Sequence, residues 1–214
     1  MPEAKRHEWG DAWTWVAIDS DTKLVPTYRV GPRDLQEAQL FMRDVAQRLS
    51  HRVQLTTDGH SPYFTAVRGA FGGEVDYAQL IKVYAPSEPR YSPGECLGTE
   101  RRVVTGSPDV SKISTSYVER QNLTMRMSMR RFTRLTNAFS KKVENLTAAV
   151  SLHFAYYNMC RVHSSLGGKT PAMAAGLSDH PWTLTDLIGL LEAAEATPIK
   201  RGSYAKTRSA QISE

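Results

Sequence analysis

Two acidic residues stand where a carboxylate could do chemistry, and the first is Asp58. It follows residues 53–57, VQLTT, whose composition predicts a short strand, and it precedes Gly59. A buried strand would hold this carboxylate rigidly at the edge of a sheet, where it can face a cleft. Asp-Gly is also a common turn pair that needs no function. By itself, Asp58 therefore indicates either a site residue or an ordinary turn.

Glu119 opens a segment that is otherwise positively charged. Residues 116–142 read SYVERQNLTMRMSMRRFTRLTNAFSKK, and no acidic residue follows Glu119 within them. On a continuous helix, at about 100° per residue, one arc is apolar and is predicted to face the core: Val118, Met125, Met129, Phe132, Leu135 and Phe139. The opposite side groups Glu119 with basic residues: Arg126, Arg130, Arg134 and Lys141.

Two simpler interpretations of this segment compete with a functional one. Ser116 and Glu119 fit the S-x-x-E capping box, so Glu119 could only close the start of a helix. A basic stripe is often just a solvated face, although a solvated helix usually alternates charges of both signs. An unrelieved positive face suits contacts with DNA phosphates. The sequence therefore predicts a set of nucleic-acid-binding residues: Arg120, Arg126, Arg130, Arg134 and Lys141.

The composition is that of an ordinary soluble protein. Of 214 residues, 41% are hydrophobic and 23% are charged, and no apolar run approaches the roughly 18 residues of a membrane helix. The first residues lack the apolar core of a signal peptide, so we expect a cytoplasmic protein. Cys96 and Cys160 are too few for a disulfide framework or a cysteine zinc site. The net charge of +5 permits a polyanionic partner without requiring one.

Hydrophobic periodicity predicts a mixed sheet covered by helices, an α/β fold. The expected strands are residues 12–19, their hairpin partner 23–30, then 53–57 and 74–84. One helix is expected to begin at Asp34, which would serve as its cap. Further helices are expected over residues 61–70, 113–158, 171–177 and 183–195. Residues 85–112 are expected to be a long loop, and residues 196–214 a basic, disordered tail after a domain that spans 1–195.

Four stretches, taken in their order and spacing, resemble bacterial insertion-sequence transposases of the DDE type, in the retroviral-integrase superfamily. They are WTWVAIDSDTKL, VQLTTDGHSPY, ISTSYVERQNLTMR and FAYYNMCRVHSSLGGKTPAMAAGL, and the resemblance covers roughly residues 12–190. It implies a ribonuclease-H-like fold. It also implies that Asp58 and Glu119 are the second and third acids of the catalytic triad, and that both are metal ligands.

The same resemblance implies metal-dependent DNA strand cleavage, with water as the nucleophile, and strand transfer, with a DNA 3′-hydroxyl as the nucleophile. Two Mg²⁺ or Mn²⁺ ions about 3.5–4 Å apart can stabilise the attacking and leaving oxygens of such displacements. Hard cations of this kind prefer carboxylate oxygens. The implied partners are DNA, as element ends and target, and further copies of the chain in a homo-oligomer, with no membrane.

The first acid of the triad is harder to place. Asp19, in AIDSDTKL, is one candidate, but in the family the first acid lies on an earlier strand, in a stretch like W-x-x-D-E. In that register Asp19 belongs to a hairpin turn. We then expect the chain to begin after the first strand and to be inactive in cleavage by itself. Two alternatives stay open: a non-catalytic fragment that binds DNA or transposase subunits, and another ribonuclease-H-like nuclease.

Three further residues are secondary candidates. His60 either contacts a substrate phosphate or caps the next helix. Arg161 and His163, in NMCRVHSS, match a terminal motif of the family. The simpler interpretation is that they brace the last helices.

Overall fold

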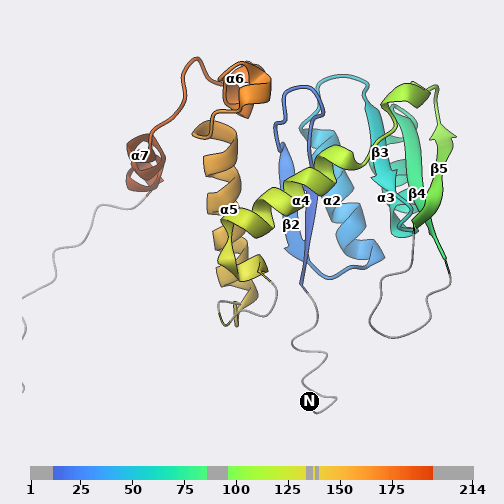
Figure 1. The fold of residues 1–214 in the computed structure, drawn as a ribbon, viewed down its shortest axis with the longest axis horizontal. Coiled ribbons are helices and arrows are strands. Elements are labelled where there is room, and N and C mark those ends of the chain that lie inside the picture. Colours follow the sequence, from blue (N-terminus) through green and yellow to red (C-terminus); the bar gives the residue numbers. More distant parts are fainter. Residues whose placement is uncertain (1–11, 86–95, 134–136, 138–139, 195–214) are drawn as a thin grey trace, which may run out of the picture. The chain divides into compact units, whose positions relative to one another are not determined.

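The computed structural model describes residues 12–85, 96–133, 137 and 140–194 (Figure 1). The chain divides into two compact units, Met1–Pro181 and Trp182–Glu214. In the second unit, the described part is built on one helix, α7 (Leu184–Ala194). The tail expected at 196–214 lies outside the described residues. Within the described part of the chain, every helix is too short or too polar to cross a membrane.

The strands of the first unit form two small sheets that lie side by side (Figure 1). In one sheet, β1 (Trp13–Ala17) and β2 (Thr27–Gly31) form the predicted antiparallel hairpin. In the other, β3 (Gln54–Asp58) runs parallel to β4 (Asp76–Tyr84), and β4 pairs antiparallel with β5 (Cys96–Thr105). The predicted mixed α/β class is therefore confirmed, but its strands divide between two sheets instead of forming one.

Strand β5 corrects the prediction that residues 85–112 form a loop. This strand of ten residues, from Cys96 to Thr105, pairs with β4, and almost all of its residues are exposed. Because neither face of this edge strand is buried, it carries no alternation of apolar and polar residues. Its centre is charged, at Glu100, Arg101 and Arg102, which is a common protection of a sheet edge against aggregation.

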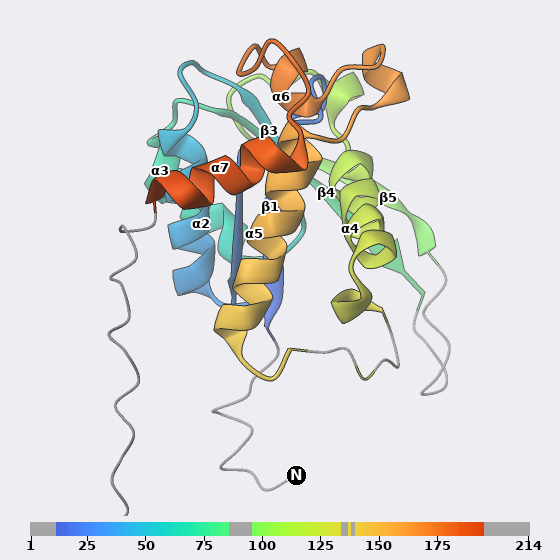
Figure 2. The same ribbon diagram turned by 90° about the vertical axis from the view of Figure 1, so that its left-hand side faces the viewer.

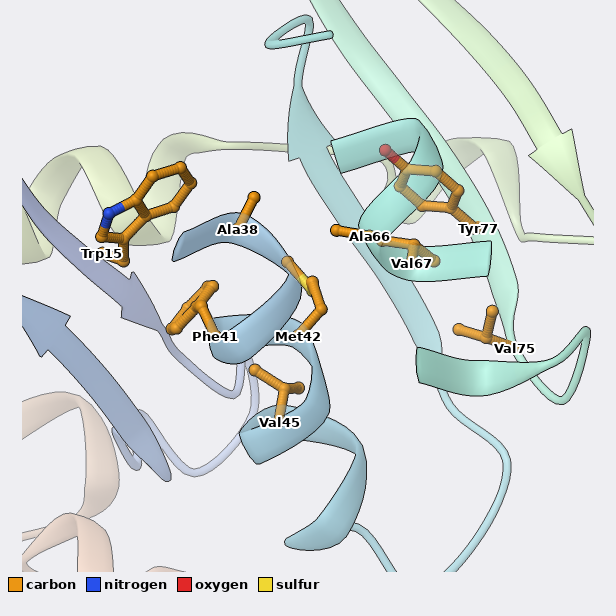
Figure 3. Packing of buried hydrophobic residues seen from close by; sticks show 9 residues of the cluster. All are labelled: Trp15, Ala38, Phe41, Met42, Val45, Ala66, Val67, Val75 and Tyr77. Atoms are coloured by element: carbon orange, nitrogen blue, oxygen red, sulfur yellow. The ribbon is translucent and has the colours of Figure 1, made fainter. Parts of the chain in front are cut away.

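Helices α2 (Leu35–Gln47) and α3 (Pro62–Phe71) cover one side of the strands. The predicted start of α2 is confirmed, because the Asp34 carboxylate accepts a hydrogen bond of 2.8 Å from the backbone N–H of Glu37. Figure 3 shows the core between these helices and the strands. It consists of Trp15, Ala38, Phe41, Met42, Val45, Ala66, Val67, Val75 and Tyr77.

A second core forms on the other side of the hairpin, under α4 (Ser116–Ser128) and α5 (Val143–Met159). Trp15 and Ala17 contact the first core, whereas Val16 and Ile18 contact the second, as the alternation of side chains along a strand requires. The hairpin thus lies between α2 on one side and α4 and α5 on the other (Figures 1 and 2).

The short elements of the first unit are α6 (Pro171–Ala174) and three 3₁₀ turns, at Val110–Lys112, Arg130–Phe132 and Ser164–Leu166. The turn at Arg130–Phe132 corrects the prediction of one helix over residues 113–158. Helix α4 ends at Ser128 because Met129 is extended, with φ −120° and ψ 107°. The resulting bend lets Met129 and Phe132 pack on the second core beside α5, so tertiary packing overrides the helical period.

Asn158 ties α5 to the loop of the hairpin. Its Oδ1 accepts a hydrogen bond of 3.0 Å from the backbone N–H of Val25, and its Nδ2 donates one of 2.9 Å to the Val25 carbonyl. One side chain thereby satisfies both polar groups of a buried residue. Asn158 therefore fixes the C-terminal half of α5 on the hairpin.

Candidate functional site

Asp58 is the last residue of β3, where it pairs with Leu80 of β4. Its side chain is exposed, and Oδ1 accepts a hydrogen bond of 3.1 Å from the backbone N–H of His60. The turn that Asp-Gly predicts is thus formed. It occupies one carboxylate oxygen, and no described residue donates a hydrogen bond to Oδ2. The turn and a ligand role are therefore compatible.

Glu119 lies in the first turn of α4 and accepts two hydrogen bonds at Oε1. The Thr115 hydroxyl donates one of 2.6 Å, and the Lys82 ammonium of β4 lies 2.7 Å away. Partial burial raises the pKa of Glu119, but the bonds from Lys82 and Thr115 outweigh it and hold the pKa below its ordinary value. The predicted capping box with Ser116 is not formed, because the helix cap is Thr115 and its hydroxyl donates to Glu119.

The register of β3 and β4 relates the two carboxylates. Lys82 lies two positions beyond Leu80, the residue that pairs with Asp58, so all three share a face of the sheet. At about 3.3 Å per residue and about 4.8 Å between strands, the backbones of Asp58 and Lys82 lie about 8 Å apart. This face is opposite to that of Tyr77, which packs in the first core. Glu119, bound to Lys82, is therefore on the same face as Asp58 and near the same strand ends.

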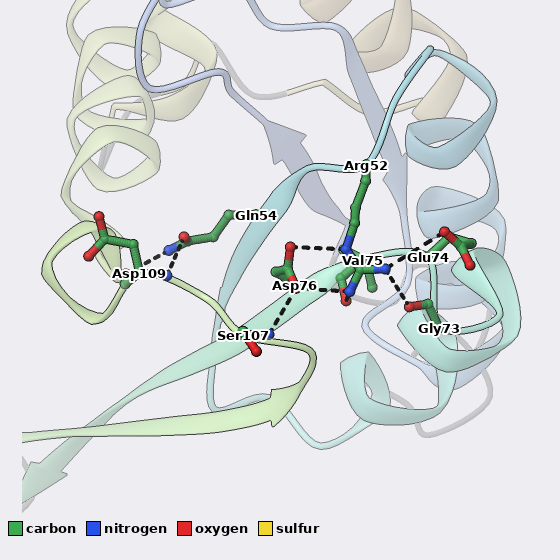
Figure 4. Close-up of polar contacts among 8 residues, drawn as sticks. All are labelled: Arg52, Gln54, Gly73, Glu74, Val75, Asp76, Ser107 and Asp109. Carbon is green, nitrogen blue, oxygen red and sulfur yellow. Dashed lines mark hydrogen bonds and ion pairs between the residues drawn. The ribbon is translucent and has the colours of Figure 1, made fainter.

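A polar network holds the segment that leads into α4 (Figure 4). Arg52 donates to both oxygens of Asp76, at 3.0 and 2.8 Å, and Asp76 also accepts from the backbone N–H of Ser107 at 2.9 Å. Gln54 of β3 exchanges two hydrogen bonds with the backbone of Asp109, at 3.0 and 2.8 Å. No sequence signal indicated these contacts, because their residues lie far apart along the chain.

Both carboxylate oxygens of Asp19 accept hydrogen bonds within its own turn. Its oxygens accept hydrogen bonds from the backbone N–H groups of Asp21, at 3.2 Å, and Thr22, at 3.1 Å, and from the Thr22 hydroxyl. Partial burial raises the pKa of Asp19, but these hydrogen bonds outweigh it and leave the pKa below its ordinary value. The turn that the sequence predicts around Asp19 is thus formed.

The predicted basic face is not formed on one helix. Arg120 and Arg126 lie on α4, Arg130 lies on the following 3₁₀ turn, and Lys141 precedes α5. Arg134 lies outside the described residues. The four described side chains are exposed, and no ion pair joins them to an acidic residue in the described ranges. Their charge remains available to a polyanion, although the helical geometry proposed for it was wrong.

Two of the three secondary candidates, His60 and His163, have packing roles in the structure. The ring of His60 lies 5.8 Å from those of Trp15 and Tyr63, and burial, with help from Arg33, lowers its pKa. It does not cap α3, whose first turn follows Ser61. The ring of His163 meets the edge of Tyr157 at 5.0 Å, whereas Arg161 is exposed.

The two carboxylates fit part of a site for Mg²⁺ or Mn²⁺. Each provides hard oxygen ligands, and each has one oxygen to which no described residue donates. Over the described ranges, no group of three or more His, Cys, Asp or Glu residues is close enough to hold a metal ion. Asp58 and Glu119 can therefore contribute to a metal site that needs a further ligand.

Comparison of the chain with models of protein families, with curated proteins and with solved structures finds no match.

Proposed function

We propose that the chain is the catalytic domain of an insertion-sequence DDE transposase, with a ribonuclease-H-like fold, and that it cleaves and joins DNA strands with Mg²⁺ or Mn²⁺. The observation that carries the proposal is the contact between Lys82 and Glu119. It holds the acid of the YVERQN motif against Lys82, on the face of the sheet that also carries the acid of the TTDGH motif.

The separation of the strands into two sheets supports the proposed ribonuclease-H-like fold. Among the described strands, β1 pairs only with β2, and β3 pairs only with β4. Both sheets nevertheless contribute to one core, through Trp15 and Tyr77 (Figure 3). A strand between β1 and β3 would join the two sheets into one. We propose that the first acid of the triad reaches Asp58 on such a strand, because Asp19 is engaged by its turn.

In this proposal the residues of the chain have distinct roles. Asp58 and Glu119 hold the metal, and Lys82 keeps the Glu119 carboxylate in place and ionised. The bound ions would stabilise charge on the oxygens around the reacting phosphorus. Arg120, Arg126, Arg130 and Lys141 hold the DNA backbone, which positions the strand without reading its bases.

A strand-cleavage assay tests the proposal. The substrate is a duplex that carries the element's end, with Mg²⁺ or Mn²⁺, and the proteins are this chain and a version extended by its upstream codons. In whichever version cleaves, Asp58→Asn and Glu119→Gln should each reduce the rate by about a thousandfold or more, since each removes a ligand. The matched control, Glu144→Gln in α5, should leave the rate unchanged. Cleavage that survives both active-site changes would contradict the proposal.

The alternative of a non-catalytic DNA-binding fragment is favoured by one observation. Exposed basic residues are present, whereas the described residues include no complete cluster of metal ligands. The same assay separates the two functions. Binding of DNA without cleavage by any version of the chain would establish the binding role and exclude the catalytic one.

A further inference from the structure

A hollow of about 680 Å³ lies between the 3₁₀ turn that follows α4 and the middle of α5. Its volume is within the range of sites that bind small organic groups. Its lining includes Arg130, Arg131, His153, Tyr156, Tyr157 and Arg161. Of its lining residues, only Arg130 has a role in the proposed function, as a contact to the DNA backbone.

The charge of the hollow is positive. Arg130, Arg131 and Arg161 contribute to its wall, which includes no acidic residue. In the described ranges, no ion pair joins these arginines to an acid. Burial lowers the pKa of His153, and the positive charge of Arg161 lowers it further. The occupant that this charge fits is an anion.

Part of the remaining wall is aromatic. Tyr156 is 45% exposed, whereas Tyr157 is buried, with its ring 6.4 Å from that of His153 and 24° from parallel to it. The Nε2 atom of His153 is buried and has no hydrogen-bond partner in the described part of the chain. The exposed ring of Tyr156 can stack a nucleobase.

We propose that this hollow binds one unpaired nucleotide of the DNA, with its base on Tyr156 and its phosphates beside Arg130 and Arg161. The proposal rests on the proposed function and names a further part of its substrate. Along α4, Glu119 and Ser128 are about 14 Å apart at 1.5 Å per residue. That length is about four nucleotides of one B-DNA strand, so one DNA strand can span the carboxylate site and the hollow.

Binding measured by fluorescence anisotropy in EDTA tests the proposal without requiring a metal. One duplex carries a single unpaired 3′ nucleotide, and its partner carries an abasic nucleotide at the same place. The chain should bind the first duplex about tenfold more tightly, as base stacking on an aromatic ring predicts. Tyr156→Ala should remove this difference, whereas Tyr156→Phe should keep it and so control for folding.

A second pair of variants tests the contribution of the arginines of the hollow to DNA binding. Arg161→Gln should weaken the binding of both duplexes, whereas Arg43→Gln, which removes an exposed charge on α2, should keep the preference for the base. Normal duplex binding with equal affinity for both DNAs would overturn the nucleotide site and leave the carboxylate site unaffected. Binding of an acidic peptide that depends on Tyr156, with no preference for the base, would also overturn it. The effect of Asp58→Asn on cleavage tests only the proposed function, so the nucleotide site and the proposed function can fail separately.

Discussion

The Nζ atom of Lys82 lies 2.7 Å from Oε1 of Glu119, and this contact joins strand β4 to the first turn of helix α4. It brings Glu119 to the face of the sheet that also carries Asp58, the residue that pairs with Leu80 two positions before Lys82. A cation at this position lowers the pKa of Glu119 and so favours the ionised carboxylate, the form that binds a metal ion.

Replacement of Lys82 should therefore raise the pKa of Glu119. A nearby positive charge favours the ionised carboxylate, so in Lys82→Met the proton binds at higher pH than in the unmodified chain. A pH titration of the side-chain carboxyl signals by NMR measures the change. Lys169→Met removes an exposed lysine beyond α5 and should leave the pKa of Glu119 unaltered. An unaltered pKa in Lys82→Met would refute the contact.

Asn158→Ala should destabilise the protein by about 1–3 kcal/mol, because it leaves the backbone N–H and carbonyl of buried Val25 without partners. Urea unfolding followed by circular dichroism measures the free energy of unfolding. Asn122→Ala, at an exposed position of α4, serves as the control and should change it by less than about 0.5 kcal/mol. Equal effects of the two changes would show that the Asn158 contacts do not stabilise the fold.

Much of the fold could be predicted from local patterns. The aromatic and β-branched residues of 12–19 and 23–30 predict the hairpin, and Asp34 predicts the start of α2. Strand β5 was missed because both of its faces are exposed, so it has no periodic signal. The end of α4 was missed because the apolar spacing continues through Met129 although the backbone does not.

The candidate site, like the fold, has features that local motifs predict and others that they do not. Local motifs predicted Asp58 and Glu119 as site residues, and the spatial relation between them depends on Lys82, which no motif indicated. Contacts between residues distant in the chain, such as those of Arg52 with Asp76, follow from the tertiary fold and leave no local pattern.

Asp76 should contribute to the loss of stability in acid. Hydrogen bonds from Arg52 and from the Ser107 backbone lower its pKa from 3.8 to about 2. Because the folded pKa is depressed, the stabilising contribution is complete above the unfolded pKa and is lost as the pH falls from about 4 to about 2. Unfolding measured across this range should show a smaller decline in Asp76→Asn than in the unmodified chain and in the control Glu144→Gln. Parallel declines in all three would contradict the role of Asp76.

Neutralising Arg126 and Arg130 should weaken binding to duplex DNA of every sequence. Each lost phosphate contact lowers the slope of log affinity against log salt by about 0.9, so the double glutamine variant should lose about two units. Anisotropy titrations between 50 and 200 mM salt, about the range over which such slopes are measured, give the slope. Replacing Arg43 and Arg68, which are exposed on α2 and α3, provides a control of equal charge. If both double variants had the same slope, DNA binding would depend on the net charge of the chain and not on the positions of Arg126 and Arg130.

The most direct test of the account is whether Asp58 and Glu119 bind the same metal ion. Paramagnetic broadening of NMR signals by Mn²⁺ measures even weak binding to this chain. We expect broadening near both residues, a loss of affinity of about tenfold or more in Asp58→Asn and in Glu119→Gln, and little additional loss when the two changes are combined, because the ligands of one ion are coupled. Unchanged Mn²⁺ affinity in both variants, or broadening remote from both residues, would contradict the account.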